Sequence, residues 1–149
     1  MTQIRAITAG DRADWQPLWD AYLEFYESDL PDAVTDDVFA RLVAGKSLHG
    51  AIAWDDDGKA LGLVHWLFHP STWSLTDYCY LEDLYVSPAT RGGGVGRALV
   101  EHVRAASTEV GASKVYWLTQ ASNTTARSLY DRLATNAGFI HYELRSAGI

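Results

Sequence analysis

The chain has 149 residues, of which 48% are hydrophobic and 21% are charged, and its formal net charge is −7. This length and composition are typical of a globular domain and not of a disordered chain, so we expect residues 1–149 to form a single domain. The acidic balance argues against a general nucleic-acid binder, which needs a basic surface, and is compatible with a cationic substrate.

Membrane, export and metal signals are missing from the sequence. No apolar run is long enough to span a bilayer, and residues 1–5 do not begin a signal peptide, so we expect no membrane partner and a cytoplasmic location. The one cysteine, Cys79, excludes an intramolecular disulfide framework and a cysteine-based zinc cluster. The five histidines show no ligand spacing, so we predict no metal.

Helical patterns dominate the first 45 residues. After a short strand over Ile4–Ile7, apolar residues at helical spacing predict an amphipathic helix that ends near Tyr26. Pro17 fits that helix only near its first turn. A second helix is predicted over Thr35–Ala44, where Gly45 ends it.

Strands follow, and then strands and helices alternate. The elements predicted after the second helix are strands over 49–54, 61–68 and 78–86, a helix over 94–110, a strand over 114–118, a helix from Asn123 or Thr124 to about 135, and a strand over 139–144. The resulting order is β-α-α-β-β-β-α-β-α-β. An antiparallel meander that leads into βαβ units predicts an α/β fold with a mixed sheet and helices on both faces.

A glycine-dense turn joins the strand that ends at Val86 to the helix that follows. Residues 91–98 read RGGGVGRA. The first turn of a helix leaves backbone N–H groups unpaired, and glycine lets those groups approach an anion. Arg91 and Arg97 add positive charge, so the turn predicts a site for a phosphorylated ligand. Neither the P-loop nor the dinucleotide-binding pattern fits the spacing, and a flexible turn without a ligand is the alternative.

The spacing of Arg91, Gly94 and Gly96 resembles motif A of the GCN5-related N-acetyltransferase (GNAT) family. The order of the elements is similar to the GNAT fold, so the resemblance covers nearly the whole chain. It implies that acetyl-CoA is the acetyl donor, with its pyrophosphate on the turn and its pantetheine arm along the preceding strand. The residues assigned to acetyl-CoA are Leu84, Tyr85, Val86, Arg91, Gly92, Gly93, Gly94, Val95, Gly96, Arg97, Asn123, Ala126 and Tyr130.

The stretch from Asn123 to Tyr130 looks like motif B of the same family, with Gly138-Phe139 behind it after a longer gap than usual. The resemblance implies that Asn123 contacts the coenzyme and that Tyr130 is the general acid that protonates the leaving thiolate. The alternatives from the residues alone are a helix N-cap for Asn123 and a core aromatic for Tyr130.

Two adjacent carboxylates, Glu82 and Asp83, interrupt an otherwise apolar strand. Neighbouring strand residues point to opposite faces, so both can face one groove only if a bulge intervenes. The surrounding sequence is similar to spermidine/spermine N-acetyltransferases and to related polyamine and histone-type enzymes. This resemblance implies that Glu82 is the base and that Asp83 anchors the substrate. The alternative is that Glu82 pairs with an arginine or caps a helix. Trp73 and its aromatic neighbours either line an acceptor channel or belong to the core.

These observations predict an N-acetyltransferase that transfers the acetyl group of acetyl-CoA to a primary amine of a small cationic acceptor, by direct attack in a ternary complex. A protein lysine or N-terminal acetyltransferase is one alternative, and an acyl-CoA-binding module without turnover is another. Relatives in this family commonly pair, so the resemblance implies a homodimer.

Overall fold

The computed structural model describes residues 2–90 and 92–147. The chain divides into two compact units, residues 1–117 and residues 118–149, and each unit is described here by itself. The expectation of a single domain over residues 1–149 stays a prediction.

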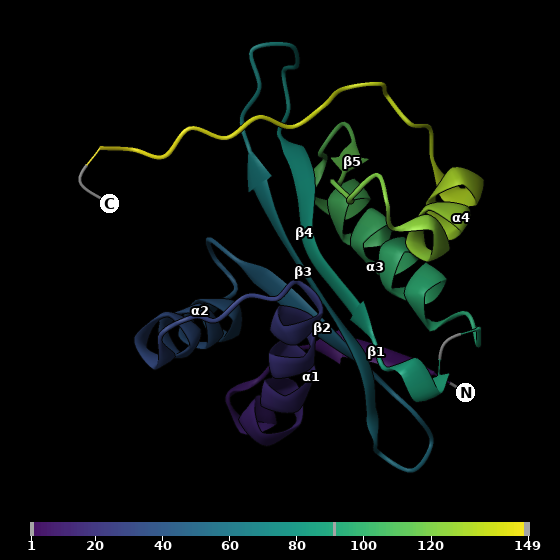
Figure 1. Cartoon of the computed structure of the whole chain (residues 1–149). Coiled ribbons are helices and arrows are strands. Elements are labelled where there is room, and N and C mark those ends of the chain that lie inside the picture. Colours follow the sequence, from purple (N-terminus) through teal and green to yellow (C-terminus); the bar gives the residue numbers. More distant parts are fainter. Residues whose placement is uncertain (1, 91, 148–149) are drawn as a thin grey trace. The chain divides into compact units, whose positions relative to one another are not determined.

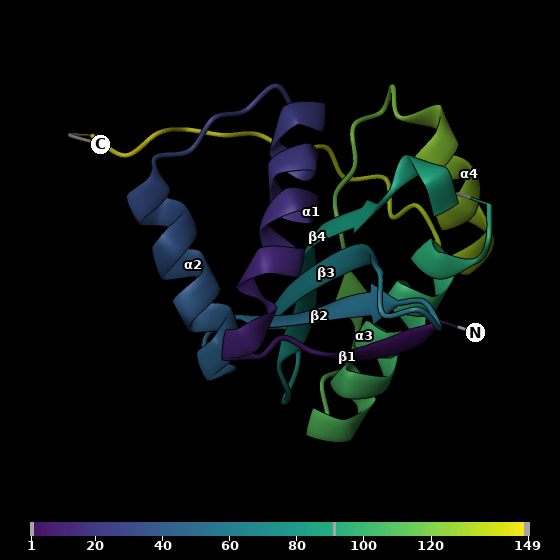
Figure 2. The same cartoon turned by 90° about the horizontal axis from the view of Figure 1, so that it is seen from below.

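The first unit is a five-stranded mixed sheet with helices on both faces, which confirms the predicted fold class. The strand order is β1-β2-β3-β4-β5, with antiparallel pairs up to β4 and a parallel β4–β5 pair. Helices α1 and α2 cover one face and α3 the other (Figures 1 and 2). The elements are β1 (Gln3–Ala6), the 3-10 helix η1 (Ala9–Asp11), α1 (Arg12–Phe25), α2 (Asp32–Ala44), β2 (His49–Trp54), β3 (Ala60–His69), β4 (Tyr78–Val86), the 3-10 helix η2 (Pro88–Thr90), α3 (Val95–Val110) and β5 (Val115–Tyr116).

The predicted apolar face of the first helix packs on the sheet. Trp15 is fully buried, stacks on Trp19 with ring centroids 5.6 Å apart, and meets Phe39 of α2 at 5.0 Å. Phe25, at the end of α1, was expected on this buried apolar face, but half of its surface is exposed. The buried residues of this core are Ile7, Trp15, Leu18, Trp19, Phe39, Leu42, Ile52, Trp54 and Leu63. This aromatic core fixes α1 against β3 and β4.

The ends of α1 and α2 differ in two respects from those predicted from the sequence. Gly45, with φ 64°, ends α2 as predicted, but α2 begins at Asp32, directly after Pro31. Pro17 lies inside α1, beyond the first turn, so its predicted place was wrong. The helix tolerates it because Ala13, whose carbonyl loses a ladder bond, is exposed. None of the helices in the described residues has both the length and the apolar character needed to cross a membrane.

The second unit contains α4 (Thr124–Leu133), and residues 134–147 after it are irregular. The final strand predicted over residues 139–144 is wrong, because these residues join no ladder among those described. Phe139 and Leu144 are at least nine-tenths exposed. An alternating sequence becomes a strand only when a neighbouring strand supplies hydrogen bonds, and the pattern alone does not supply that neighbour. The strand predicted over 114–118 is likewise reduced to β5.

Gly62 of β3 provides the tightest backbone approach on the α3 face. A Cβ at this position would lie 2.6 Å from the carbonyl oxygen of Tyr85 and 3.3 Å from Cδ1 of Leu99. Because the nearest atom is backbone, the strand itself would have to move to admit a side chain.

We therefore expect Gly62→Ala to lower the free energy of unfolding by about 1–3 kcal/mol, the usual cost of overpacking. Gly10→Ala is the matched control, because its Cβ would meet nothing closer than Thr8 Oγ1 at 3.9 Å. Urea denaturation of both variants measures the difference. Equal stability of the two variants would contradict the proposed steric role of Gly62.

Candidate active site

A bulge in β4 lies at the paired carboxylates. His65 of β3 is opposite Asp83, and the next residue, Trp66, is opposite Leu81, so Glu82 has no partner across the β3–β4 ladder. Upstream of the bulge, Tyr80 interacts electrostatically with Tyr26, the residue that directly follows α1. Downstream, Tyr85 packs against the core under α1, so the inward-facing parity changes at Glu82. The bulge predicted as the condition for a shared groove is therefore present.

The two carboxylates differ in exposure. Glu82 is open to solvent, whereas the Asp83 side chain is 14% exposed. Asp83 Oδ2 lies 2.9 Å from Nδ1 of His65, and the indole N–H of Trp15 donates to Nε2 of that histidine at 3.1 Å. One carboxylate is thus anchored in the core and the other remains free to meet a ligand.

Electrostatics ties the helix residues to this pair. Partial loss of hydration, followed by the negative charge of Asp83, raises the pKa of Glu82, while the positive charge of Arg41 acts in the opposite direction. Burial and then the Asp83 carboxylate raise the pKa of Tyr22. Burial, with a smaller contribution from Glu82, raises the pKa of Tyr80 to about 12. These phenols therefore remain protonated donors beside the carboxylates.

The outer edge of β4 opens beside the bulge. β4 pairs with β5 only at Cys79 and Tyr80, while on its other side it continues to pair with β3 as far as Val86. Beyond Tyr80, the edge toward β5 therefore has no strand ladder in the described residues. Leu84 and Tyr85, two of the predicted acetyl-CoA residues, lie on this stretch. A bound chain with amide groups can add to such an edge.

The glycine turn leads from β4 into α3. Gly92 and Gly94 have φ of 90° and 82°, and a Cβ on either would meet no atom within 4 Å. The ladder of α3 begins with the N–H of Ala98, which donates to Gly94 at 3.0 Å, so the amides of residues 95–97 precede it. Open space, backbone donors and the positive end of the helix dipole fit a phosphate group. Arg91 lies outside the described residues.

Motif B lies in the second unit. Asn123 caps α4, because its Oδ1 accepts from the N–H of Ala126 at 3.3 Å, and this confirms the N-cap interpretation. Tyr130 lies on α4 and is partly buried. The structure describes this unit by itself, so the roles of Asn123, Ala126 and Tyr130 toward a coenzyme stay predictions.

Trp73 lies in the loop between β3 and β4 and is 89% exposed. Its side chain lies in solvent and does not line a channel, and its assignment to the substrate stays a prediction. Trp66 is buried against His102 of α3, which fits the core alternative. In the part of the chain that the structure describes, no group of three or more His, Cys, Asp or Glu side chains could hold a metal ion.

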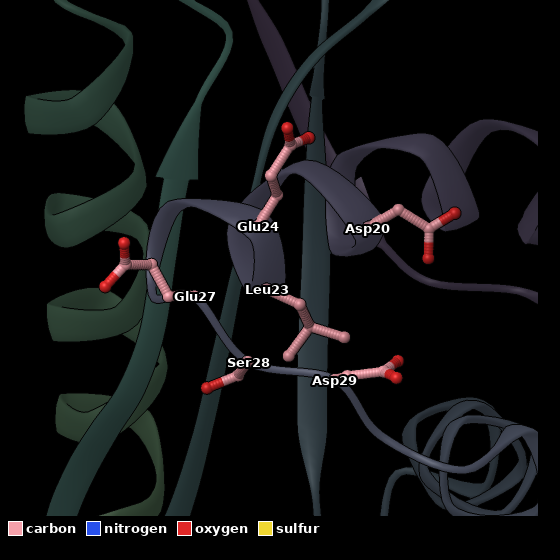
Figure 3. A pocket seen from close by; sticks show the side chains of 6 residues that line it. All are labelled: Asp20, Leu23, Glu24, Glu27, Ser28 and Asp29. Atoms are coloured by element: carbon pink, nitrogen blue, oxygen red, sulfur yellow. The ribbon is translucent and has the colours of Figure 1, made fainter.

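An acidic pocket of about 610 Å³ lies at the end of α1 (Figure 3). Its lining residues are Asp20, Leu23, Glu24, Glu27, Ser28 and Asp29. Glu82 and Asp83 are not among them.

Sequence reasoning missed the residues that support Asp83. The helical pattern before Tyr26 places Trp15 and Tyr22 on an apolar face, and the spacing of the five histidines, His65 among them, speaks only to metal binding. The sequence offers one signal, namely the indole N–H and phenol O–H groups on that face. It does not predict the pairing of His65 with Asp83, because that pairing depends on the register of β3 on β4.

Known proteins resemble this chain in sequence and in fold. Residues 15–134 match the model of the acetyltransferase (GNAT) family. The chain is 35% identical over 142 residues to the D-amino-acid N-acetyltransferase HPA3 of Saccharomyces cerevisiae, covering 94% of this chain and 88% of the relative. It is 28% identical over 112 residues to the thialysine N-epsilon-acetyltransferase of Caenorhabditis elegans, covering 72% and 69%.

Among solved structures, the aminoglycoside N-acetyltransferase AAC(6')-Iy in complex with CoA has the same fold, with a TM-score of 0.85, 19% identity, and coverage of 99% of this chain and 95% of that one. The matched family model spans most of the chain, and the yeast relative exceeds 30% identity over nearly all of it. The chain therefore belongs to the acetyltransferase (GNAT) family.

Proposed function

We propose that this chain transfers the acetyl group of acetyl-CoA to the primary amine of a small cationic acceptor of the diamine or polyamine type. The observation that carries the proposal is the bulge that brings Glu82 and Asp83 to the side of β4 covered by α1. Two neighbouring carboxylates on one side of the strand suit a ligand with positive charge. The same strand leads to the glycine turn, where the donor is expected to bind.

The donor half of the site is assigned to backbone groups. The amides of residues 92–97 would hold the pyrophosphate, except that of Gly93, which donates to the carbonyl of Thr90 at 3.3 Å. Arg97 and Arg91 would add charge, and the edge of Leu84, Tyr85 and Val86 would pair with the pantetheine arm. Acetyl-CoA supplies an activated thioester when bound. The structurally similar aminoglycoside enzyme has been solved in complex with CoA, which supports acetyl-CoA as the donor.

The acceptor half handles a proton. An alkylamine with a pKa near 10.4 is almost entirely protonated at neutral pH, so a base is useful. Asp83 would receive the ammonium, and Glu82 would take the proton directly or through water. The amine nitrogen then adds to the thioester carbon, and a backbone N–H near Leu84 or Tyr85 stabilises the oxyanion. The carbon–sulfur bond breaks as Tyr130 protonates the departing thiolate, the nitrogen loses its second proton to solvent, and solvent returns a proton to Tyr130.

No protein nucleophile is needed in this scheme. Cys79 is buried, and burial raises the pKa of its thiol to about 11, which is the reverse of what an attacking thiolate requires. Direct transfer between two bound reactants, with positioning as the main source of rate, therefore suits the chain.

An amino acid is the second candidate acceptor. The yeast and nematode relatives are named for D-amino acids and thialysine. Arg41 of α2 acts electrostatically on Glu82 and also pairs with Asp37 at 2.9 Å, so an acceptor carboxylate would share this cation with Asp37. The acidic pocket at the end of α1 favours a polycation instead.

Acetylation of protein lysines or N-termini, and CoA binding without turnover, are the remaining alternatives. The homodimer also stays a proposal.

Thiol release from acetyl-CoA, measured over a panel of diamines, polyamines, D- and L-amino acids and basic peptides, tests the proposal. We expect the highest kcat/KM for a small acceptor with at least two cationic groups. A preference for amino acids would favour the second candidate, and a preference for peptides would overturn the small-molecule proposal. CoA binding without any acetylation would leave only the binding module.

The raised pKa of Glu82 predicts the acid limb of the pH profile. Because the carboxylate must be deprotonated to accept a proton, kcat/KM should fall on the acid side at a higher pH than an ordinary glutamate would give. Asp83→Asn removes the neighbouring negative charge, so the limb should move to lower pH, and Glu82→Gln should remove the limb and lower kcat/KM about 100-fold. Glu101→Gln on α3 is the control. A limb unmoved in Asp83→Asn would contradict the assignment.

Tyr130→Phe removes the assigned acid and keeps the ring. We expect kcat to fall about 100-fold, because the thiolate then leaves without a proton donor, while acetyl-CoA affinity measured by calorimetry remains close to that of the unaltered chain. Tyr142→Phe, in the exposed segment after α4, is the control. Full activity of Tyr130→Phe would remove its proposed role.

A further inference from the structure

A buried chain of hydrogen bonds runs from the core to the carboxylate pair. It begins at Trp15, which has no exposed surface, passes through His65, which is 4% exposed, and ends at Asp83. The two links measure 3.1 Å from Trp15 Nε1 to His65 Nε2 and 2.9 Å from His65 Nδ1 to Asp83 Oδ2. The three residues come from α1, β3 and β4, so the tertiary fold assembles the chain.

The chemistry of the links fixes the position of the proton. An indole N–H can only donate, so Nε2 of His65 must offer its lone pair to Trp15. The imidazole is then neutral with its hydrogen on Nδ1, and that N–H donates to Asp83 Oδ2. The other carboxylate oxygen, Oδ1, is not engaged by His65.

Packing prevents the imidazole from turning over. The Trp19 ring centroid lies 5.4 Å from that of His65. On the neighbouring strand, Gly50 is paired with His65, and a Cβ there would come within 3.1 Å of Cδ2 of the imidazole. The ring therefore fills its space and presents Nδ1 to Asp83 in one orientation.

A second indole in the same cluster shows how such a donor is satisfied when nothing further depends on it. Trp19 donates to the hydroxyl of Thr35 at 3.3 Å, and the pair ends inside the core. The hydrogen bonds that start at Trp15 instead pass through a buried imidazole to a partly exposed carboxylate beside Glu82. A buried polar ring costs desolvation that an aliphatic side chain would avoid, so its retention indicates use at the site.

We propose that His65, with its proton fixed on Nδ1 by Trp15, is a positioning residue that holds Asp83 in one orientation so that Oδ1 receives the ammonium of the acceptor. The role deepens the proposed function and rests on it. Tyr22 on α1 also interacts with the Asp83 carboxylate and limits its movement. A fixed carboxylate loses no rotational freedom when the ammonium binds, so preorganisation favours acceptor binding.

Paired variants at His65 test the role. His65→Leu removes the donor, and we expect the KM for the acceptor to rise about tenfold while the KM for acetyl-CoA stays unchanged. His65→Asn places an amide N–H near the position of Nδ1 and should restore most of the acceptor affinity. Thr35→Val is the matched control, because it removes a buried indole partner in the same cluster. We expect it to lower the melting temperature without changing the acceptor KM.

A spectroscopic measurement reads the proton directly. Long-range nitrogen–proton correlation spectra of the imidazole should show His65 protonated on Nδ1 in the unaltered chain. Trp15→Phe should relax this tautomer and raise the acceptor KM, and it serves as a second variant should His65→Leu not fold.

The outcomes separate the two proposals. An unaltered chain that acetylates no amine overturns the proposed function, and the acceptor role of His65 with it. An active chain whose acceptor KM is unchanged in His65→Leu and in Trp15→Phe overturns the inference alone, as does a proton found on Nε2. A general loss of affinity for both substrates, not rescued by His65→Asn, would assign His65 to the core only.

Discussion

The bulge at Glu82 is the constraint on which the rest of the site depends. A regular strand would have sent Glu82 and Asp83 to opposite faces, with one of them toward the apolar contact between the sheet and α3. One extra residue in β4 changes the parity, so that Cys79 and Leu81 stay buried while Asp83 turns toward His65. The same strand remains paired with β3 up to Val86, so the bulge alters the facing of side chains without breaking the sheet.

Helix α1 uses one face for two purposes. Its tryptophans build the aromatic core that holds the helix on the sheet. From the same helix, the indole N–H of Trp15 holds His65, the partner of Asp83, and Tyr22 interacts with Asp83 itself. Stability and site geometry are therefore linked, because a change that loosens the Trp15 packing also releases His65. Helix α1 therefore belongs to the site as well as to the hydrophobic core.

Local signals in the sequence sufficed where the physics is local. The glycine turn, the end of α2 at Gly45 and the Asn123 cap depend on backbone conformations and short-range bonds, and each can be recognised from a few residues. The link between His65 and Asp83 could not be predicted, because it requires the register of β3 on β4. The expected strand over residues 139–144 failed for the same reason, since a pattern of alternation does not name a partner.

The two halves of the proposed site rest on different kinds of atoms, and this bears on how an acceptor is selected. The donor half uses backbone amides of the glycine turn and of the β4 edge, which many sequences can provide. The acceptor half uses side chains, namely Asp83, Glu82 and the residues of α1 and α2 around them. Exposed side chains on α1 and α2 can change without altering the core or the backbone of β4. The balance between Arg41 and the acidic pocket at the end of α1 is therefore where a choice between an amino acid and a polyamine would be made, while the transfer chemistry stays the same.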